Sequence, residues 1–176
     1  MKALMFLQVF TLFIGLSSIC TAQSTNEEMI KEWERAKAYT KEYLDAMPEK
    51  DYALKPTPEM RSFAEQMLHI TDGNYGLVSA AIGDKSPHGM GEMEKSADKS
   101  KAAVTQAVMD GYDFVINDIK NLPADKLNEK VTLFDKFDMT RKVALEKAFE
   151  HQTHHRGQTT VYLRLAGVKP PQEKLF

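Results

Sequence analysis

The sequence predicts an all-α protein built as a four-helix bundle. Four long segments carry apolar residues at helical spacing, loops with proline and glycine separate them, and the alternating pattern of a half-buried strand is scarce. Such segments favour an up-down arrangement of helices. The longer connections before the third and fourth segments also allow a crossover.

The first helix is expected over about Asn26 to Met47, because apolar residues recur there at intervals of three and four and Pro48 follows. These apolar positions are Trp33, Ala36, Tyr39, Tyr43 and Leu44. The next segment, PEKDYALKPTPEM, is predicted to be a loop, since Pro56 and Pro58 exclude a regular helix.

The second helix is expected to begin near Pro58 or Ser62 and to continue to about Ile82, where Gly83 can end it. The segment GDKSPHGMGEMEKS follows. It is rich in glycine, serine and proline, which is typical of a flexible linker.

The third helix is expected over about Ala97 to Asn121. Its apolar stripe consists of Val104, Val108, Tyr112, Val115 and Ile119. The stretch LPADKLNEKVTLFDKFDMT then reads as irregular or partly extended. The fourth helix is expected to begin at Thr140, a natural N-cap, and to end at Leu165 or Ala166, before Gly167 as the C-cap.

The N-terminal segment has the layout of a secretory signal peptide. Lys2 precedes an apolar run over residues 3–16, and small residues follow up to Ala22, after which we expect cleavage. Lipid anchoring at Cys20 is disfavoured because bulky Ile19 precedes it. A retained membrane anchor is also disfavoured, because the run is shorter than the roughly 20 residues that a spanning helix needs. The chain is therefore expected to be exported, periplasmic or secreted.

The remaining residues, 23–176, suit one domain with one core. Without Lys2 the 23 lysines and arginines become 22 against 25 acidic residues, a net charge of −3. No basic cluster stands out, which argues against nucleic-acid binding. The single cysteine, Cys20, leaves with the signal peptide, so the mature chain has no disulfide, thiol nucleophile or thiolate metal ligand.

Three of the five histidines lie in the segment FEHQTHHRGQTTVY of the fourth helix. His151 and His155 are four residues apart and share one helix face, so the two imidazoles can bind one divalent ion. Small or mildly polar residues flank them on that face, whereas His154 lies on a more mixed face. Arg156 is most simply a cation on the surface or at the end of the bundle; in a functional interpretation it could hold an anionic group.

His69 in the second helix is the candidate for a third ligand, since a catalytic site usually has three protein ligands and an open position. Residues one and two heptads after it are Gly76 and Gly83, which would leave space on this seam. The simpler interpretation of His69 is a hydrogen-bonded core residue. His88 lies in the linker and is expected at the surface.

The segments FAEQMLHITDGNY and MTRKVALEKAFEHQTHHRGQTTVYLRLAGVKPP, in this order, resemble the DinB family of four-helix metal-binding proteins. This superfamily includes bacillithiol and mycothiol S-transferases and maleylpyruvate isomerase. The resemblance covers essentially the whole mature chain. It implies that His69, His151 and His155 bind one divalent ion, zinc or nickel, and it favours a homodimer.

The resemblance also implies catalysis of a thiol S-transferase or a hydrolase type on an unknown small molecule. An ion held by three neutral histidines keeps its charge and can acidify a water or a thiol, or polarise a carbonyl. Export argues against the thiol route, because thiol cofactors are expected to be scarce outside the cytoplasm. No convincing general base is identifiable, although Glu65, Asp72 and Tyr75 are near in sequence. A non-catalytic metal-binding protein and a purely structural bundle remain the alternatives.

Overall fold

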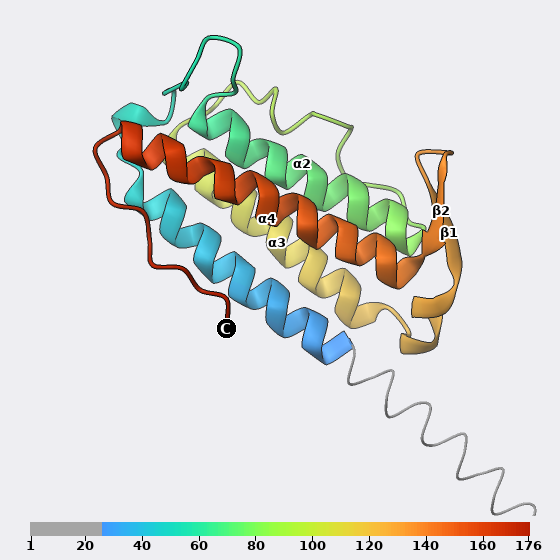
Figure 1. Cartoon of the computed structure of the whole chain (residues 1–176). Helices are drawn as coiled ribbons and strands as arrows, with labels where there is room; N and C mark the ends of the chain where they lie inside the picture. Colours follow the sequence, from blue (N-terminus) through green and yellow to red (C-terminus); the bar gives the residue numbers. More distant parts are fainter. Residues whose placement is uncertain (1–25) are drawn as a thin grey trace, which may run out of the picture.

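The computed structural model describes residues 26–176, so the expected signal peptide lies outside the described residues. The chain forms four long helices and one small sheet over this range (Figure 1). The elements are the N-terminal helix (residues 26–46), α2 (Phe63–Ile82), α3 (Lys101–Asn121), β1 (Lys130–Leu133), β2 (Phe137–Thr140) and α4 (Arg141–Leu165). Two short 3-10 helices, Glu49–Asp51 and Ala124–Asn128, lie in the connections.

The four helices form a bundle in which the N-terminal helix and α2 occupy opposite corners. Each of them packs against α3 and α4: Trp33 of the N-terminal helix meets Tyr112 of α3 and Phe149 of α4 edge-on. α2 and α3 run in the same direction, antiparallel to the other two helices (Figure 1). The connection 83–100 therefore runs back along the bundle. The expected four-helix bundle is confirmed, and this connection is the crossover that the sequence allowed.

Side-chain caps determine where three of the helices begin. The hydroxyl of Ser62 accepts the backbone N–H of Glu65, whose carboxylate accepts the backbone N–H of Ser62, which completes a capping box at α2. Thr140 caps α4 as expected. The third helix begins at Lys101 rather than near Ala97, because Ser100 supplies its cap.

The stretch before α4 contains an antiparallel hairpin, which the sequence indicated only as partly extended. β1 pairs with β2, with Lys130 opposite Thr140 and Leu133 opposite Phe137. The chain turns through Phe134 and Asp135, which both adopt positive φ angles, of 55° and 53°. The hairpin leads directly into α4 and lies at the end of the bundle where α2 also ends (Figure 1).

The core is built from one apolar face of each helix. The apolar positions expected for the first and third helices are all buried. The largest fully buried side chains are Trp33, Leu44, Met47, Phe63, Met67, Leu68, Ile70, Tyr112, Ile119, Leu145, Tyr162 and Leu163. Burial of this apolar surface is the main favourable contribution to folding. Within residues 26–176, no helix has the length and apolar character needed to cross a membrane.

The crossover segment is attached to α2 by a carboxylate. Both oxygens of Asp72 accept backbone N–H groups of this segment, from Met93 at 3.0 Å and from Glu94 at 2.9 Å. These two hydrogen bonds fix the loop beside the middle of α2. The side chain of Glu94 is thereby placed next to His69, which lies one turn before Asp72.

We expect Ser62→Ala to lower the free energy of unfolding by about 1 kcal/mol, because the first turn of α2 loses its capping hydroxyl. Urea denaturation followed by circular dichroism measures this loss. Ser96→Ala is the matched control, since Ser96 lies in the crossover segment and caps no helix. It should change the stability by less than about 0.5 kcal/mol. Equal losses in the two variants would contradict the capping account.

Candidate metal centre

The structure brings His69 of α2 together with His151 and His155 of α4. One ring nitrogen from each histidine lies within 4.8 Å of the other two. The ring centroids are 5.1 Å apart for His69 and His151, 4.4 Å for His69 and His155, and 4.5 Å for His151 and His155. All three residues are partly buried. The expected pair on one face of α4 and the expected third residue from α2 therefore meet at one point.

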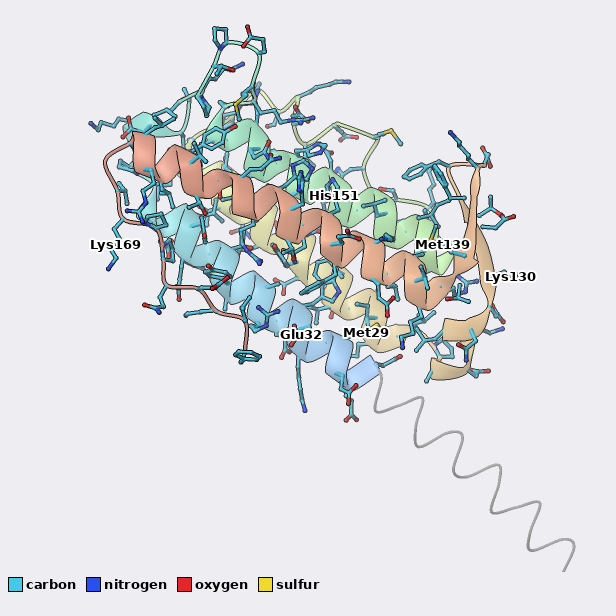
Figure 2. The ribbon with its side chains drawn as sticks, in the orientation of Figure 1. Met29, Glu32, Lys130, Met139, His151 and Lys169 are labelled. Atoms are coloured by element: carbon cyan, nitrogen blue, oxygen red, sulfur yellow. The ribbon has the colours of Figure 1, made fainter. Side chains whose placement is uncertain are left out.

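A glycine of α2 makes room for the ring of His151, which lies midway along the bundle (Figure 2). A Cβ atom at Gly73 would lie 2.3 Å from Cε1 and 2.4 Å from Nδ1 of that ring, closer than atoms can approach. Gly73 lies one turn after His69. Because Gly73 has no side chain, α2 and α4 can approach closely enough for the ring of His69 to lie beside those of His151 and His155. The glycine expected to leave this space, Gly76, has no atom within 4 Å of such a Cβ.

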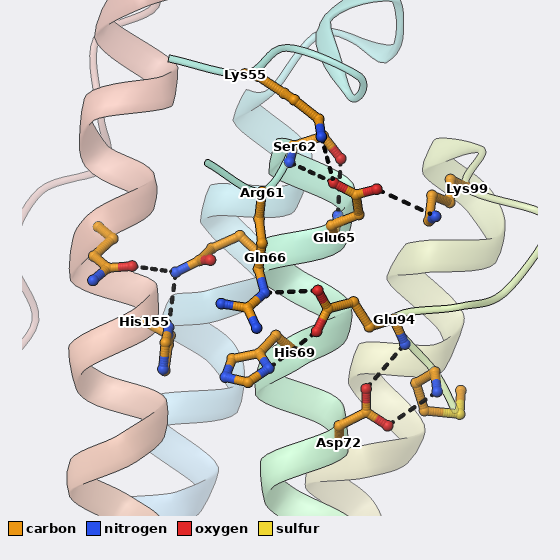
Figure 3. A network of polar contacts seen from close by, with 12 residues as sticks. Lys55, Arg61, Ser62, Glu65, Gln66, His69, Asp72, Glu94, Lys99 and His155 are labelled. Atoms are coloured by element: carbon orange, nitrogen blue, oxygen red, sulfur yellow. Dashed lines mark hydrogen bonds and ion pairs between the residues drawn. The ribbon is translucent and has the colours of Figure 1, made fainter. Parts of the chain in front are cut away.

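The carboxylate of Glu94 connects His69 to an arginine (Figure 3). Oε2 of Glu94 lies 3.2 Å from Nδ1 of His69, and Oε1 accepts the Nε–H of Arg61 at 2.7 Å. A carboxylate on one ring nitrogen fixes the orientation of an imidazole and leaves the other nitrogen for an ion. The role of Glu94 was not predicted from the sequence, because no residue pattern in the linker indicates that the linker runs back along α2.

The side-chain amides of Gln66 and Gln158 link His155 to His154. The side-chain nitrogen of Gln66 lies 2.8 Å from Nδ1 of His155 and also donates to the amide oxygen of Gln158. The amide of Gln158 in turn lies 2.9 Å from Nε2 of His154. The carboxylate of Glu94 accepts the Nδ1–H of His69, which leaves Nε2 of that ring for a ligand. The amide nitrogen of Gln66 can only donate, so Nδ1 of His155 accepts and Nε2 carries the proton; exchange of oxygen and nitrogen in the amides of Gln66 and Gln158 reverses this bond and leaves Nε2 of His155 for an ion.

The surroundings keep the three imidazoles neutral. Burial lowers the pKa of all three rings. The pKa falls to about 4 for His151 and to about 3 for His155, where the neighbouring histidines add to the effect of burial. The positive charge of Arg61 acts in the same direction on each ring. Neutral imidazoles are the form that binds a metal ion.

The remaining histidines lie outside the cluster. His154 is exposed on α4, as its helix phase predicted. His88 lies in the crossover segment with Nδ1 3.3 Å from a carboxylate oxygen of Glu92, and its ring centroid is 4.7 Å from that of Tyr75. His88 is partly exposed, in line with the expected surface position.

None of the three carboxylate or phenol groups considered as a general base faces the histidines. Glu65 belongs to the capping box and pairs with two lysines, and the backbone N–H of Ser62 is the main reason that its pKa falls to about 2. Asp72 binds the crossover segment. Tyr75 packs against His88 and Phe114. Glu94 is the carboxylate that the structure places at the cluster.

Arg156 is buried, with 5% of its surface exposed, which corrects the expected surface position. Its guanidinium lies 4.6 Å from the ring centroid of Tyr39, and it donates to the amide oxygen of Gln152 at 3.0 Å. The same oxygen accepts the hydroxyl of Tyr112 at 2.8 Å. Arg156 therefore ties α4 to the N-terminal helix and α3. A cation over an aromatic face gains most when both are removed from water.

We expect Gly73→Ala to weaken metal binding by at least about tenfold, because the added methyl group displaces the ring of His151. Metal titration against a competing chromophoric chelator measures the affinity. Gly76→Ala is the matched control. It should leave the affinity unchanged while it stabilises the helix by up to about 1 kcal/mol. Wild-type affinity in the Gly73→Ala variant would show that the ring position does not matter for binding.

The metal-free protein should lose stability as the pH falls below 6.5, the ordinary pKa of histidine. The unfolded chain takes up protons there, whereas folded His151 and His155 resist protonation down to about pH 4 and about pH 3. Urea unfolding between about pH 7 and about pH 4 tests this. A His151→Gln/His155→Gln double variant should show a flatter dependence. An identical slope in both proteins would assign the acid sensitivity to other groups.

The model of the DinB family matches residues 22–175. Among solved structures, a DinB-like protein from Bacillus cereus superposes with a TM-score of 0.73 at 19% identity, covering 84% of this chain and 97% of that one. A DinB-like protein from Bacillus subtilis, YjoA, gives 0.65 at 17% identity, with coverages of 85% and 96%.

YfiT from Bacillus subtilis, a probable metal-dependent hydrolase with an unusual four-helix bundle topology, is also similar. Its TM-score is 0.63 at 14% identity, and the match covers 81% of this chain and 87% of YfiT. None of the curated proteins compared with the sequence matches it. These structural likenesses agree with the bundle described above, and the family match spans nearly all of the described residues. The chain belongs to the DinB family.

Proposed function

We propose that this protein is a metal-dependent enzyme in which His69, His151 and His155 hold one divalent ion, zinc or nickel. The observation that carries the proposal is the meeting of three neutral, partly buried imidazoles from two helices at one point. Three nitrogen ligands suit either ion, so the ligand set does not distinguish them.

The residues present fit an ion at this point. Glu94 accepts from Nδ1 of His69, so that Nε2 of this ring is available. Nε2 of His155 becomes available when the side-chain oxygen of Gln66, in place of its nitrogen, faces Nδ1 of that ring. Nδ1 of His151 is buried and has no hydrogen-bond partner within residues 26–176. A buried polar atom without a partner is unusual and is normally satisfied by water or an ion. Because the folded protein already keeps the rings neutral, binding at neutral pH displaces few protons.

A cavity of about 540 Å³ lies one side chain away from the histidine cluster, and none of the three histidines lines it. Its lining includes Gln66 and Glu94, which contact His155 and His69. The other lining residues are Glu59, Met60, Arg61, Gln158 and Tyr162. A site that only stores an ion or stabilises the fold is usually closed by protein ligands. All three histidines are only partly buried, which leaves an ion on them accessible and favours catalysis over storage.

A divalent ion at this point would supply Lewis-acid chemistry, which serves thiol transfer and hydrolysis alike. The protein's own contribution is positional. Glu94 and Gln66 contact two of the rings, and the carboxylate of Glu94 is engaged by Arg61 and His69 together. Hydrolysis draws support from the fold shared with YfiT, and from the expected export to a compartment where thiol cofactors are scarce.

We propose export on the basis of the signal-peptide pattern in residues 1–22. The family match begins at residue 22, so the apolar run lies outside it. The alternative functions are a non-catalytic metal-binding protein and a purely structural bundle. A purely structural bundle gives no reason for three neutral imidazoles to meet at one point, and a storage site gives none for their partial exposure.

Metal uptake by protein purified without a histidine tag tests the proposal. We expect about one equivalent of zinc or nickel in the wild type after dialysis. His69→Ala, His151→Ala and His155→Ala should each abolish stoichiometric uptake, because two imidazoles hold an ion weakly. His154→Ala and His88→Ala are matched controls and should bind as the wild type does. Elemental analysis of the dialysed wild type and the five variants measures the uptake.

Less than about a tenth of an equivalent in the wild type would leave the structural bundle as the explanation. Equal damage from His154→Ala would mean that the cluster does not consist of the three residues named. Uptake of one equivalent with the cavity closed around the ion would favour storage.

A further inference from the structure

Arg61 occupies a fixed position between the two helices that supply the histidines. It directly precedes Ser62, the N-cap of α2, and its backbone carbonyl accepts the hydroxyl of Tyr162 from α4 at 2.8 Å. Its side chain points back toward the cluster, where Nε donates to Glu94 at 2.7 Å (Figure 3). One carboxylate therefore separates the guanidinium from the ring of His69.

The two terminal nitrogens of Arg61 are available to a ligand. Only Nε makes a hydrogen bond to a residue within 26–176, and 39% of the side chain is exposed. Arg61 lines a cavity together with Glu94 and Gln66, the partners of His69 and His155. A guanidinium that engages the protein through Nε alone presents two parallel N–H groups, the geometry that matches a carboxylate or a phosphate.

The charges at the cavity favour an anion. The carboxylate of Glu94 is shared between Arg61 and His69, and Glu59 is the second carboxylate in the lining. Together they offset two positive charges. The positive charge of Arg61 reaches all three rings, since it contributes to lowering the pKa of each. With a divalent ion on neutral imidazoles, the site carries a net positive charge, and an anionic ligand would be drawn to it.

The start of α2 does not compete for this anion. The backbone N–H groups of Phe63 and Ala64 donate to the carbonyls of Leu54 and Tyr52, and that of Glu65 donates to the hydroxyl of Ser62. The first turn therefore has its donors satisfied within the protein. Arg61 is the group in the described cavity lining that can pair with an anion.

We propose that Arg61 binds an oxyanion group of the substrate, a carboxylate or a phosphate, and that the enzyme acts on small anionic molecules. This inference rests on the proposed metal-dependent function. The anionic group pairs with the terminal nitrogens of Arg61, which places the rest of a small molecule in the cavity next to the histidines. Arg61 in this role selects and orients the substrate and takes no part in bond making.

Chemical-shift titration of the zinc-loaded protein by NMR tests the proposal with two probes, inorganic phosphate and acetate, and with chloride to match ionic strength. We expect saturable shifts for at least one probe at the amides of Arg61, Glu94 and Gln66. Arg61→Gln should weaken that binding by at least about tenfold while zinc uptake stays stoichiometric, because a charge-assisted pair is lost. Arg61→Lys keeps the positive charge but lacks the two parallel N–H groups. Its affinity for the anion should lie between those of the wild type and of Arg61→Gln.

Lys55→Gln is the matched control. Lys55 lies near the start of α2, but it pairs with Glu65 and does not line the cavity. Its loss should leave anion binding within about twofold of the wild type, because an exposed charge is screened by salt. Equal weakening by Lys55→Gln and Arg61→Gln, or unchanged binding in Arg61→Gln, would overturn the assignment. Absence of zinc uptake in the wild type would instead overturn the proposed function, and the inference with it.

Discussion

The candidate site depends on the close approach of α2 and α4 at Gly73. The ring of His151 occupies the space that a side chain at position 73 would fill, with the nearest ring atom 2.3 Å from the missing Cβ. Because the helices are antiparallel, the same approach places His69 beside His155. Tight packing in a helix bundle normally gains stability by filling space with apolar side chains. Here the space is given to an imidazole, which suggests that the position of this ring serves function.

A second layer of residues, Asp72, Glu94 and Arg61, surrounds the histidines and orients the ring of His69. Asp72 fixes the crossover segment, the segment carries Glu94 to His69, and Glu94 joins the ring to Arg61. These surroundings change the pKa of His69 in two opposite directions. Burial and the charge of Arg61 lower the pKa of His69, while Glu94 acts in the opposite direction and orients it. The result is a cluster of neutral, oriented imidazoles at the edge of a cavity, with a cation beside it.

Much of the fold could be predicted from the sequence, because helical periodicity and caps are local signals. The buried faces of the first and third helices and the cap at Thr140 follow from residue spacing alone. The predicted start of α3, near Ala97, was wrong by four residues, because Ser100 supplies the cap and the helix begins at Lys101. The direction of the crossover segment depends on contacts distant in sequence, such as those of Asp72, and spacing does not encode them.

The same distinction applies to the site. The facing of His151 and His155 is a property of one helix. His69 was the candidate third ligand from its position on a seam of small residues, and the resemblance to the DinB family also implied it. Glu94 and Gly73 were missed because their roles arise only when two segments meet. Arg156 was expected at the surface, since charge predicts exposure, yet Tyr39 and Gln152 accommodate it inside the bundle.

X-ray absorption spectroscopy of the metal-loaded protein tests the central claim most directly, because it reports the atoms bound to the ion. The account predicts three imidazole nitrogens at about 2.0–2.1 Å, with the remaining coordination from light atoms of solvent or ligand. A spectrum with one imidazole or none would contradict it and would place the ion elsewhere on the protein.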